Sequence, residues 1–271
     1  MRGMQTDHHA ENPSHARSTG EHLRELRSRQ RVSQLELSLR VGVSQRHLSC
    51  VETGRARASR EMLLALLDAL DAPLTERNQA LLAAGFAPAY GARRLDQPDL
   101  APVRLAIGHL LAAHEPAPAL VIDSTWTVVQ ANRGVHALLR LLGVDPAALA
   151  QDFNLLRTLL RPDGLRRALS NPVEVCASVW QRAEREAVHA PELRPLLEEL
   201  RPFVPRQAFA MKADAPMLFT RVATSVGELS FFSAFTTFGS PLDVTIASLR
   251  IEHLFPADDA TRVAMQEALA G

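Results

Sequence analysis

The chain has 271 residues, with 30 basic and 30 acidic side chains, so its formal net charge is zero. Hydrophobic residues make up 46% of it, which suffices for a buried core and excludes global disorder. The apolar runs are short and the first residues are polar, so we expect neither a membrane span nor a secretory signal. Two cysteines, Cys50 and Cys176, make no disulfide framework, which favours a cytoplasmic protein.

Aromatic residues and charge are unevenly distributed along the chain. Residues 1–85 contain no Phe, Trp or Tyr, whereas aromatic side chains concentrate between Trp126 and Phe255. This contrast predicts two separate cores. Residues 17–60 carry ten arginines against four glutamates. Such a basic block in a neutral chain is typical of a polyanion-binding surface, although an ordinary solvated helix face has the same composition.

The first third of the chain has the pattern of a small helical domain. We expect Thr19, Ser33 and Ser44 to begin successive helices, because their hydroxyl groups can accept hydrogen bonds from the first turn. Gly42 supplies a left-handed turn between the second and third helices. Leu37 is the expected core residue of the second helix. Two more helices are predicted over residues 59–70 and 75–85.

The rest of the chain mixes helices and strands. Short β segments at 119–123 and 127–130 form a predicted hairpin, and Asn132 then opens a helix. Three antiparallel strands are expected near the C-terminus, at residues 218–224, 228–238 and 243–255. Helices on one side of this sheet would make an α+β domain. The predicted organisation is a disordered tail over 1–17, a helical domain over 18–88, a linker over 89–101 and an α+β domain over 102–271.

The segment from Gln34 to Gly54 has the spacing of a helix-turn-helix. Ser38 is small enough for two helices to approach closely, and Leu48 and Val51 fill the angle between them. The side chains expected to point outward are Gln45, Arg46 and Ser49. Glutamine and arginine in the first turn of a helix can bind adenine and guanine edges in a major groove, and the helix N-terminus favours a phosphate.

Motif residues extend this pattern over Thr19 to Leu70: Arg27, Ser33-Gln34, Leu37, Val41-Gly42-Val43-Ser44, Leu48, Val51-Glu52 and Gly54-Arg55. On these residues the segment resembles the XRE (Cro/C1-type) helix-turn-helix family. The resemblance implies that Gln34 and Gln45 approach the DNA backbone and base edges, and that Arg27 pairs with Glu52. Ser38 stands where alanine is commoner. We expect a double-stranded operator bound by a homodimer through Gln34, Ser44, Gln45, Arg46, Ser49, Arg55 and Arg57.

A second resemblance covers the chain to about Leu269. It rests on Leu74 to Tyr90, on Asp123-Ser124-Thr125-Trp126 leading to Ala131-Asn132-Arg133, on Asn154 to Arg157, and on Val226 to Leu229. These segments resemble XRE regulators with a C-terminal MmyB-like ligand-binding domain. The resemblance implies a PAS-like α+β fold with a pocket of the fatty-acid type. Ala131 and the strand Ser248 to Glu252 depart from the commoner pattern, so the identity of the ligand does not transfer.

A pocket between a PAS-like sheet and its helices would bind an apolar small molecule such as a fatty acid. Its expected lining is Trp126, Val128, Leu138, Trp180, Phe219, Phe231 and Phe235. Each of these side chains could equally fill a solid core. In that case the C-terminal domain is a dimerisation or protein-contact module that binds no ligand. Asn132 fits a helix cap better than a ligand contact.

The sequence gives little support for a metal site, a cofactor site or an enzyme active site. His8, His9 and His15 have no neighbouring metal ligands, and neither a phosphate loop nor a nucleophile elbow is present, so we expect no metal, no cofactor and no enzyme activity. Cys176 is expected to be buried. The acids near the middle of the C-terminal domain are interleaved with arginines, which predicts an ordinary solvated helix face: Glu184, Glu186, Glu198 and Glu199.

Overall fold

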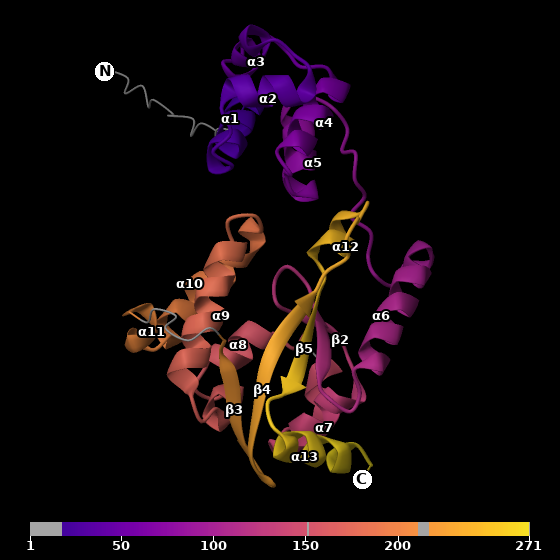
Figure 1. Cartoon of the computed structure of the whole chain (residues 1–271), viewed down its shortest axis with the longest axis vertical. Helices are drawn as coiled ribbons and strands as arrows, with labels where there is room; N and C mark the ends of the chain where they lie inside the picture. The colour runs from indigo at the N-terminus through magenta and orange to yellow at the C-terminus, as the bar shows by residue number, and fades with distance from the viewer. Residues whose placement is uncertain (1–17, 151, 211–216, 271) are drawn as a thin grey trace, which may run out of the picture. The chain divides into compact units, whose positions relative to one another are not determined.

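The computed structural model describes residues 18–150, 152–210 and 217–270 of the chain (Figure 1). The chain divides into two compact units, Met1–Tyr90 and Gly91–Gly271, and each has a hydrophobic core of its own. The tail expected over residues 1–17 lies outside the described residues. Within the described ranges, every helix is too short or too polar to cross a membrane.

Five helices make up the N-terminal unit, as predicted: α1 (Thr19–Arg29), α2 (Gln34–Val41), α3 (Gln45–Glu52), α4 (Arg60–Ala69) and α5 (Leu74–Ala83). The Ser33 and Ser44 hydroxyl groups cap α2 and α3, and Gly42 takes the left-handed conformation with φ of 75°. The first helix is capped by Ser18 and not by Thr19. Ser18 Oγ accepts from the Glu21 amide, and the Glu21 carboxylate accepts from the Ser18 amide, a reciprocal capping box.

The core of this unit follows helical periodicity. Leu37 is fully buried, whereas Leu35 and Leu39 of the same helix are exposed, so the prediction of Leu37 as the core residue is confirmed. Leu48 and Val51 of α3 are buried against the same cluster. Because Leu48 and Val51 lie on one face of a short helix, the first turn of α3 is held with its opposite face toward solvent.

The C-terminal unit is an α+β domain with a five-stranded antiparallel sheet. Its strands are β1 (Ala119–Ile122), β2 (Val128–Ala131), β3 (Phe219–Thr224), β4 (Gly227–Thr236) and β5 (Arg250–Pro256), in the order β2-β1-β5-β4-β3. The strand predicted from residue 243 begins only at Arg250. Asp243 instead caps the short helix α12 (Val244–Ser248) by accepting the Thr245 amide.

Helices cover both faces of this sheet, so the expectation of helices on one side was wrong. Ala119 and Val121 of β1 pack with Ile107 and Leu111 of α6. Leu120 and Ile122 point to the other face, called the inner face below, and pack there with α8 and α9. The remaining helices, seen in Figure 1, are α6 (Ala101–Ala113), α7 (Arg133–Leu141), α8 (Leu155–Leu160), α9 (Pro172–Glu186), α10 (Arg194–Leu200), α11 (Arg206–Ala210) and α13 (Asp259–Ala270).

Asn132 connects β2 to α7 and satisfies every polar group of its amide. Its Oδ1 accepts from the Ala119 amide at 3.0 Å and from the Val135 amide at 3.1 Å. Its Nδ2 donates to the carbonyl oxygens of Leu111 at 3.1 Å and Ala117 at 2.9 Å. The predicted role as a helix cap is therefore confirmed, and the same side chain also fastens α6 to β1.

Candidate nucleic-acid interface and ligand site

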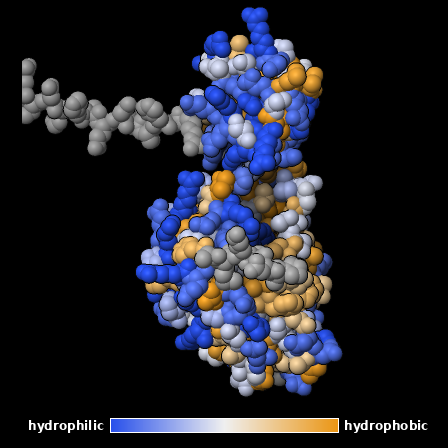
Figure 2. Space-filling view, turned by 60° about the vertical axis from the view of Figure 1, so that its left-hand side comes forward, coloured by the Kyte–Doolittle hydropathy of each residue, from blue (hydrophilic) through white to orange (hydrophobic). Residues whose placement is uncertain are grey.

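The first turn of α3 presents a row of exposed polar side chains. Ser44 Oγ accepts from the His47 amide at 3.2 Å, which closes the N-terminus of the helix. Gln45, Arg46 and His47 are exposed, while Ser49 is half-buried one turn later. The N-terminal unit has a mostly hydrophilic surface in the view of Figure 2. These groups are free to contact base edges or phosphates.

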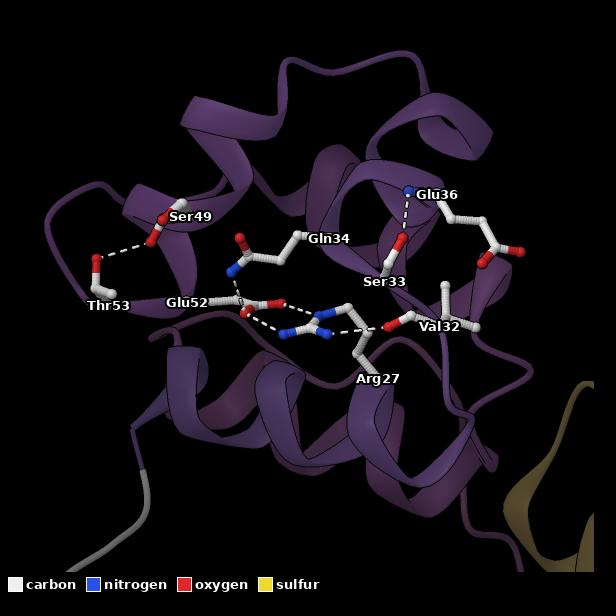
Figure 3. Close-up of polar contacts among 8 residues, drawn as sticks. All are labelled: Arg27, Val32, Ser33, Gln34, Glu36, Ser49, Glu52 and Thr53. Atoms are coloured by element: carbon white, nitrogen blue, oxygen red, sulfur yellow. Dashed lines mark hydrogen bonds and ion pairs between the residues drawn. The ribbon is translucent and has the colours of Figure 1, made fainter.

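A polar network behind this surface ties three helices together (Figure 3). Arg27 of α1 donates from Nε and Nη2 to the two carboxylate oxygens of Glu52, at 2.6 and 2.8 Å. Its Nη1 donates to the Val32 carbonyl at 3.0 Å. Gln34 of α2 donates from Nε2 to Glu52 Oε2 at 2.8 Å. The Arg27–Glu52 pair that the family resemblance implies is thus present, and it is bidentate.

Glu52 remains ionised in this setting in spite of its burial. Burial acts to raise the pKa of Glu52, but the hydrogen bonds from Arg27 and Gln34 and the charges of Arg27 and Arg24 outweigh it and lower that pKa. The bond to Glu52 also fixes the Gln34 amide: one N–H of Nε2 is engaged, so the second N–H and the carbonyl oxygen are left to meet a partner. Gln34 is half-buried at the first position of α2.

The segment after α3 carries the other expected contacts. Arg55 and Arg57 are both exposed, and Arg55 Nε donates to Thr53 Oγ1 at 3.1 Å. Thr53 in turn donates to the Ser49 carbonyl at 2.7 Å, so the C-terminus of α3 is closed by a side chain (Figure 3). The sequence interpretation did not include His47 or Thr53. His47 is exposed directly after Arg46, and Thr53 bonds both the Ser49 carbonyl and Arg55.

The structure separates the side chains predicted to line a ligand pocket. Trp126, Val128 and Trp180 are buried in one cluster, and Phe231 is buried in a second one, against which Leu138 packs. Phe235 is 43% exposed on the inner face. Phe219 pairs directly with Phe232 and so lies on the opposite face of the sheet from Phe231. Phe219 therefore cannot line one cavity with the other six residues.

The turn between β1 and β2 places Trp126 in an unusual conformation. Its φ of 66° lies in the left-handed region, which bulky residues rarely adopt. Asp123 Oδ1 stabilises the turn by accepting from the Thr125 and Thr127 amides at 2.8 and 3.0 Å. The indole Nε1 of Trp126 then donates to Glu186 Oε2 at 2.8 Å. The turn thereby directs a large aromatic side chain onto the inner face.

Glu186 is part of a partly buried charged cluster and not of a solvated helix face, so that prediction is corrected. Its Oε1 accepts a hydrogen bond from Arg182 Nε at 2.9 Å and forms an ion pair with Arg250 Nη1 at 2.6 Å. The side chains of Arg182, Glu186 and Arg250 are each 20% exposed or less. Residues far apart in the sequence meet here, and nothing in the local charge pattern of α9 indicates this.

A surface groove of about 600 Å³ lies elsewhere in the domain, between the end of α6, the end of β5 and the start of α13. Its lining includes His114, Phe255, Asp258 and Arg262, and none of the predicted ligand residues. The inner face with its charged cluster is therefore a separate feature from this groove.

Two family models match the chain. Residues 103–268 match the MmyB-like transcription regulator ligand binding domain, and residues 19–80 match a helix-turn-helix domain. The chain belongs to the MmyB-like transcription regulators. The two matched segments lie in the two units described above, the helical unit and the α+β unit. Membership makes the chain a DNA-binding transcription regulator and confirms the family and the fold class predicted from the sequence.

Comparisons with individual proteins add little to what the family match shows. No curated protein sequence compared with this MmyB-like regulator matches it. A solved structure of an RNA-binding Light-Oxygen-Voltage receptor is 16% identical, with a TM-score of 0.27 over 94% of this chain. The chain spans 63% of the length of that receptor chain. This similarity is too low to bear on fold or function.

Proposed function

We propose that the chain is a sequence-specific DNA-binding regulator, active as a homodimer in the cytoplasm, whose C-terminal domain senses an apolar small molecule. The observation that carries the DNA-binding part is the exposed first turn of α3, with Gln45 and Arg46 outward and Leu48 buried behind them. A helix of this kind enters the major groove with its N-terminal residues against base edges.

Each of the expected DNA-contact residues has a role in this proposal. Gln45 and Arg46 read base edges, because glutamine and arginine pair with adenine and guanine through two hydrogen bonds. Ser49 lies one turn further along the same face. Gln34, Arg55 and Arg57 contact phosphates on either side, and the Ser44 cap brings the helix N-terminus to a phosphate.

Operator selection from random DNA, followed by fluorescence anisotropy, tests this division of roles. Arg46→Ala should weaken binding to the selected operator by about 1–3 kcal/mol and leave binding to unrelated DNA almost unchanged. Arg57→Ala, the matched control, should weaken both by similar factors. If Arg46→Ala weakens both duplexes equally, Arg46 contacts only phosphate and the proposed reading of the operator by this residue is wrong.

The sensing part of the proposal rests on the family of the C-terminal domain and on its inner face. A PAS-like arrangement is supported by the five-stranded sheet with helices packed on its inner face. Trp126, Val128, Trp180, Phe231 and Phe235 point to this face or pack beside it. An apolar ligand that favours one arrangement of a dimer would change operator affinity, whereas equal affinity for both arrangements would change nothing.

Delipidated protein with single-chain lipids added back, both fatty acids and neutral fatty amides, tests the sensing part. Binding measured by calorimetry, together with a shift of operator affinity of about 5- to 150-fold, would support it. A Phe231→Trp variant, which adds volume at a buried position of the inner face, should lose both effects. Lipid that binds without shifting operator affinity would leave a pocket with no regulatory role. If lipid does not bind at all, the domain is better described as a contact module.

A further inference from the structure

A carboxylate lies at the centre of the inner face of the sheet. Glu252 of β5 stands in cross-strand register with Leu120 of β1 on one side and with Phe235 of β4 on the other. Its Oε1 accepts a hydrogen bond from Ser233 Oγ at 2.9 Å. No ion pair reaches it from the described residues. Glu252 is half-buried, so its carboxylate is only partly hydrated and has a single protein donor.

The guanidinium groups of Arg182 and Arg250 lie on the same face of the sheet as Glu252. Arg182 of α9 lies with its guanidinium carbon 3.6 Å from the centre of the Phe235 ring and 4.8 Å from that of the Trp126 ring. Only its Nε donates to an acceptor among the described residues, namely Glu186. Arg250 pairs with Glu186 through Nη1 and donates from Nη2 to the Asp123 carbonyl, while its Nε is buried with no acceptor among them. Arg182 and Arg250 therefore keep N–H groups that have no acceptor among the described residues.

A ligand group that binds here must satisfy both the donors of the arginines and the acceptor of Glu252. Glu186 already accepts two hydrogen bonds, from Trp126 and Arg182, and forms an ion pair with Arg250, so it has little left to offer. Spare donors belong to the arginines and a spare acceptor belongs to Glu252. A group that accepts from Arg182 and donates to Glu252 would complete both sets of bonds.

Charge balance decides which kind of group this is. The titratable groups that face Glu252 are Arg182 and Glu186 from α9 and Arg250 from β5, while β1 and β4 contribute none in register with it. Two arginines and two glutamates already cancel. A further anion would lie against Glu252 and a further cation against two guanidinium groups, and both are costly in a partly buried site. Burial also raises the pKa of Glu252, as expected for a carboxylate short of donors.

We propose, building on the ligand-sensing function above, that the polar head of the ligand binds between Arg182 and Glu252. The site selects a neutral head that both accepts and donates, of which a primary carboxamide is the simplest, over a carboxylate or an ammonium on the same apolar chain. Trp126 and Phe235 form the aromatic wall beside the head. A site that prefers the carboxylate of a fatty acid would not be expected to place an acid such as Glu252 beside it.

Isothermal titration calorimetry on the full delipidated chain tests this with three probes of equal chain length: decanamide, decanoate and decylamine. At mildly alkaline pH, which favours the ionised form of Glu252, decanamide should bind at least about tenfold more tightly than either charged probe, because like charges are excluded from the site. If the three probes bind alike, the assignment of the head site is overturned while ligand sensing stands. If none binds, both the head site and the sensing of single-chain apolar ligands are overturned.

Two variants locate the effect. Glu252→Gln removes the repelling charge and adds a donor, so decanoate should gain on decanamide by about tenfold or more. Arg182→Met removes the donors and should weaken decanamide at least about tenfold, while the Glu252 side chain itself is kept. Arg157→Met is the matched control, because Arg157 forms an exposed pair with Glu199 and its loss should leave all three affinities unchanged. Unchanged head preference in both Glu252→Gln and Arg182→Met, in protein that unfolds cooperatively, would refute the proposal.

Discussion

Gly20 of α1 lies so close to Glu52 of α3 that no side chain fits between them. A Cβ at Gly20 would stand 2.6 Å from the carbonyl oxygen of Glu52 and equally close to that of Val51. Arg27 follows Gly20 by two helical turns and faces the same helix. The close approach at Gly20 therefore lets the Arg27 guanidinium reach the Glu52 carboxylate and holds α3 in place.

Gly20→Ala should destabilise the N-terminal unit. Alanine is the better helix former by roughly 1 kcal/mol, but overpacking against a backbone costs about 1–3 kcal/mol. Gly108→Ala is the matched control, because Gly108 is also helical and has no atom within 4 Å of its Cβ position. Urea denaturation should show a loss for Gly20→Ala and a gain for Gly108→Ala. A gain at both sites would mean that α1 moves away from α3 at little cost.

Glu52→Gln should cost about 3–5 kcal/mol, because it leaves the largely buried Arg27 charge without its partner. The parent protein should also lose stability in acid. The folded-state pKa of Glu52 is lowered from its ordinary value of 4.5. The stabilisation is thus fully present above 4.5 and is lost as the pH falls through the lower, folded-state pKa.

Denaturant midpoints measured from neutral pH into acid check this dependence. The difference in stability between parent and Glu52→Gln should shrink as the pH falls. Glu36→Gln serves as control, since Glu36 and Arg40 form an exposed pair about half accessible to solvent, worth less than about 1 kcal/mol. A constant difference between parent and Glu52→Gln at all pH values would contradict the assigned role of Glu52.

Operator binding should depend steeply on salt. Each phosphate contact adds a slope of about −0.9 to the logarithm of affinity against that of salt, so a dimer should give roughly −4 to −8. Arg57→Ala should make this slope shallower by about one contact per protomer. Anisotropy titrations over a salt series measure both. A flat response would show that the ten arginines of residues 17–60 do not act on phosphates.

Local features of the fold could be predicted from the sequence, because they depend on near neighbours. The helical period selects Leu37 over Leu35 and Leu39, and hydroxyl side chains before the α2 and α3 patterns locate their N-termini. The predicted cap of α1 is wrong by one residue because Ser18 and Thr19 are both capping types. Glu21, three residues after Ser18, identifies the correct one.

Features set by tertiary contacts could not be predicted in the same way. Strand alternation places Phe231 and Phe235 on one face, but which face Phe219 shares depends on its register with Phe232. The charge pattern of α9 is that of an exposed helix, and only the turn at Trp126 and the distant Arg250 bury Glu186. The position of α12 also depends on Asp243, whose capping role is invisible inside a β-branched run.

Asn132→Ala should destabilise the C-terminal unit by about 3 kcal/mol or more. The substitution removes a helix cap, worth about 1 kcal/mol, and leaves buried donors and acceptors unpaired at about 1–3 kcal/mol each. Asn132→Asp separates these contributions. It keeps both acceptor bonds, to the Ala119 and Val135 amides, but turns a carboxylate oxygen toward the carbonyls of Leu111 and Ala117.

The carboxylate that Asn132→Asp introduces would be buried without a donor on one side, so its folded-state pKa should lie above the ordinary aspartate value of about 3.9. Its penalty is then largest at neutral pH and shrinks as the pH falls and the group is protonated, opposite in sign to the dependence expected for Glu52. Thermal unfolding of parent, Asn132→Ala and Asn132→Asp over the same pH series measures it. If Asn132→Asp matches the parent at neutral pH, the bonds from Nδ2 do not hold α6 against β1.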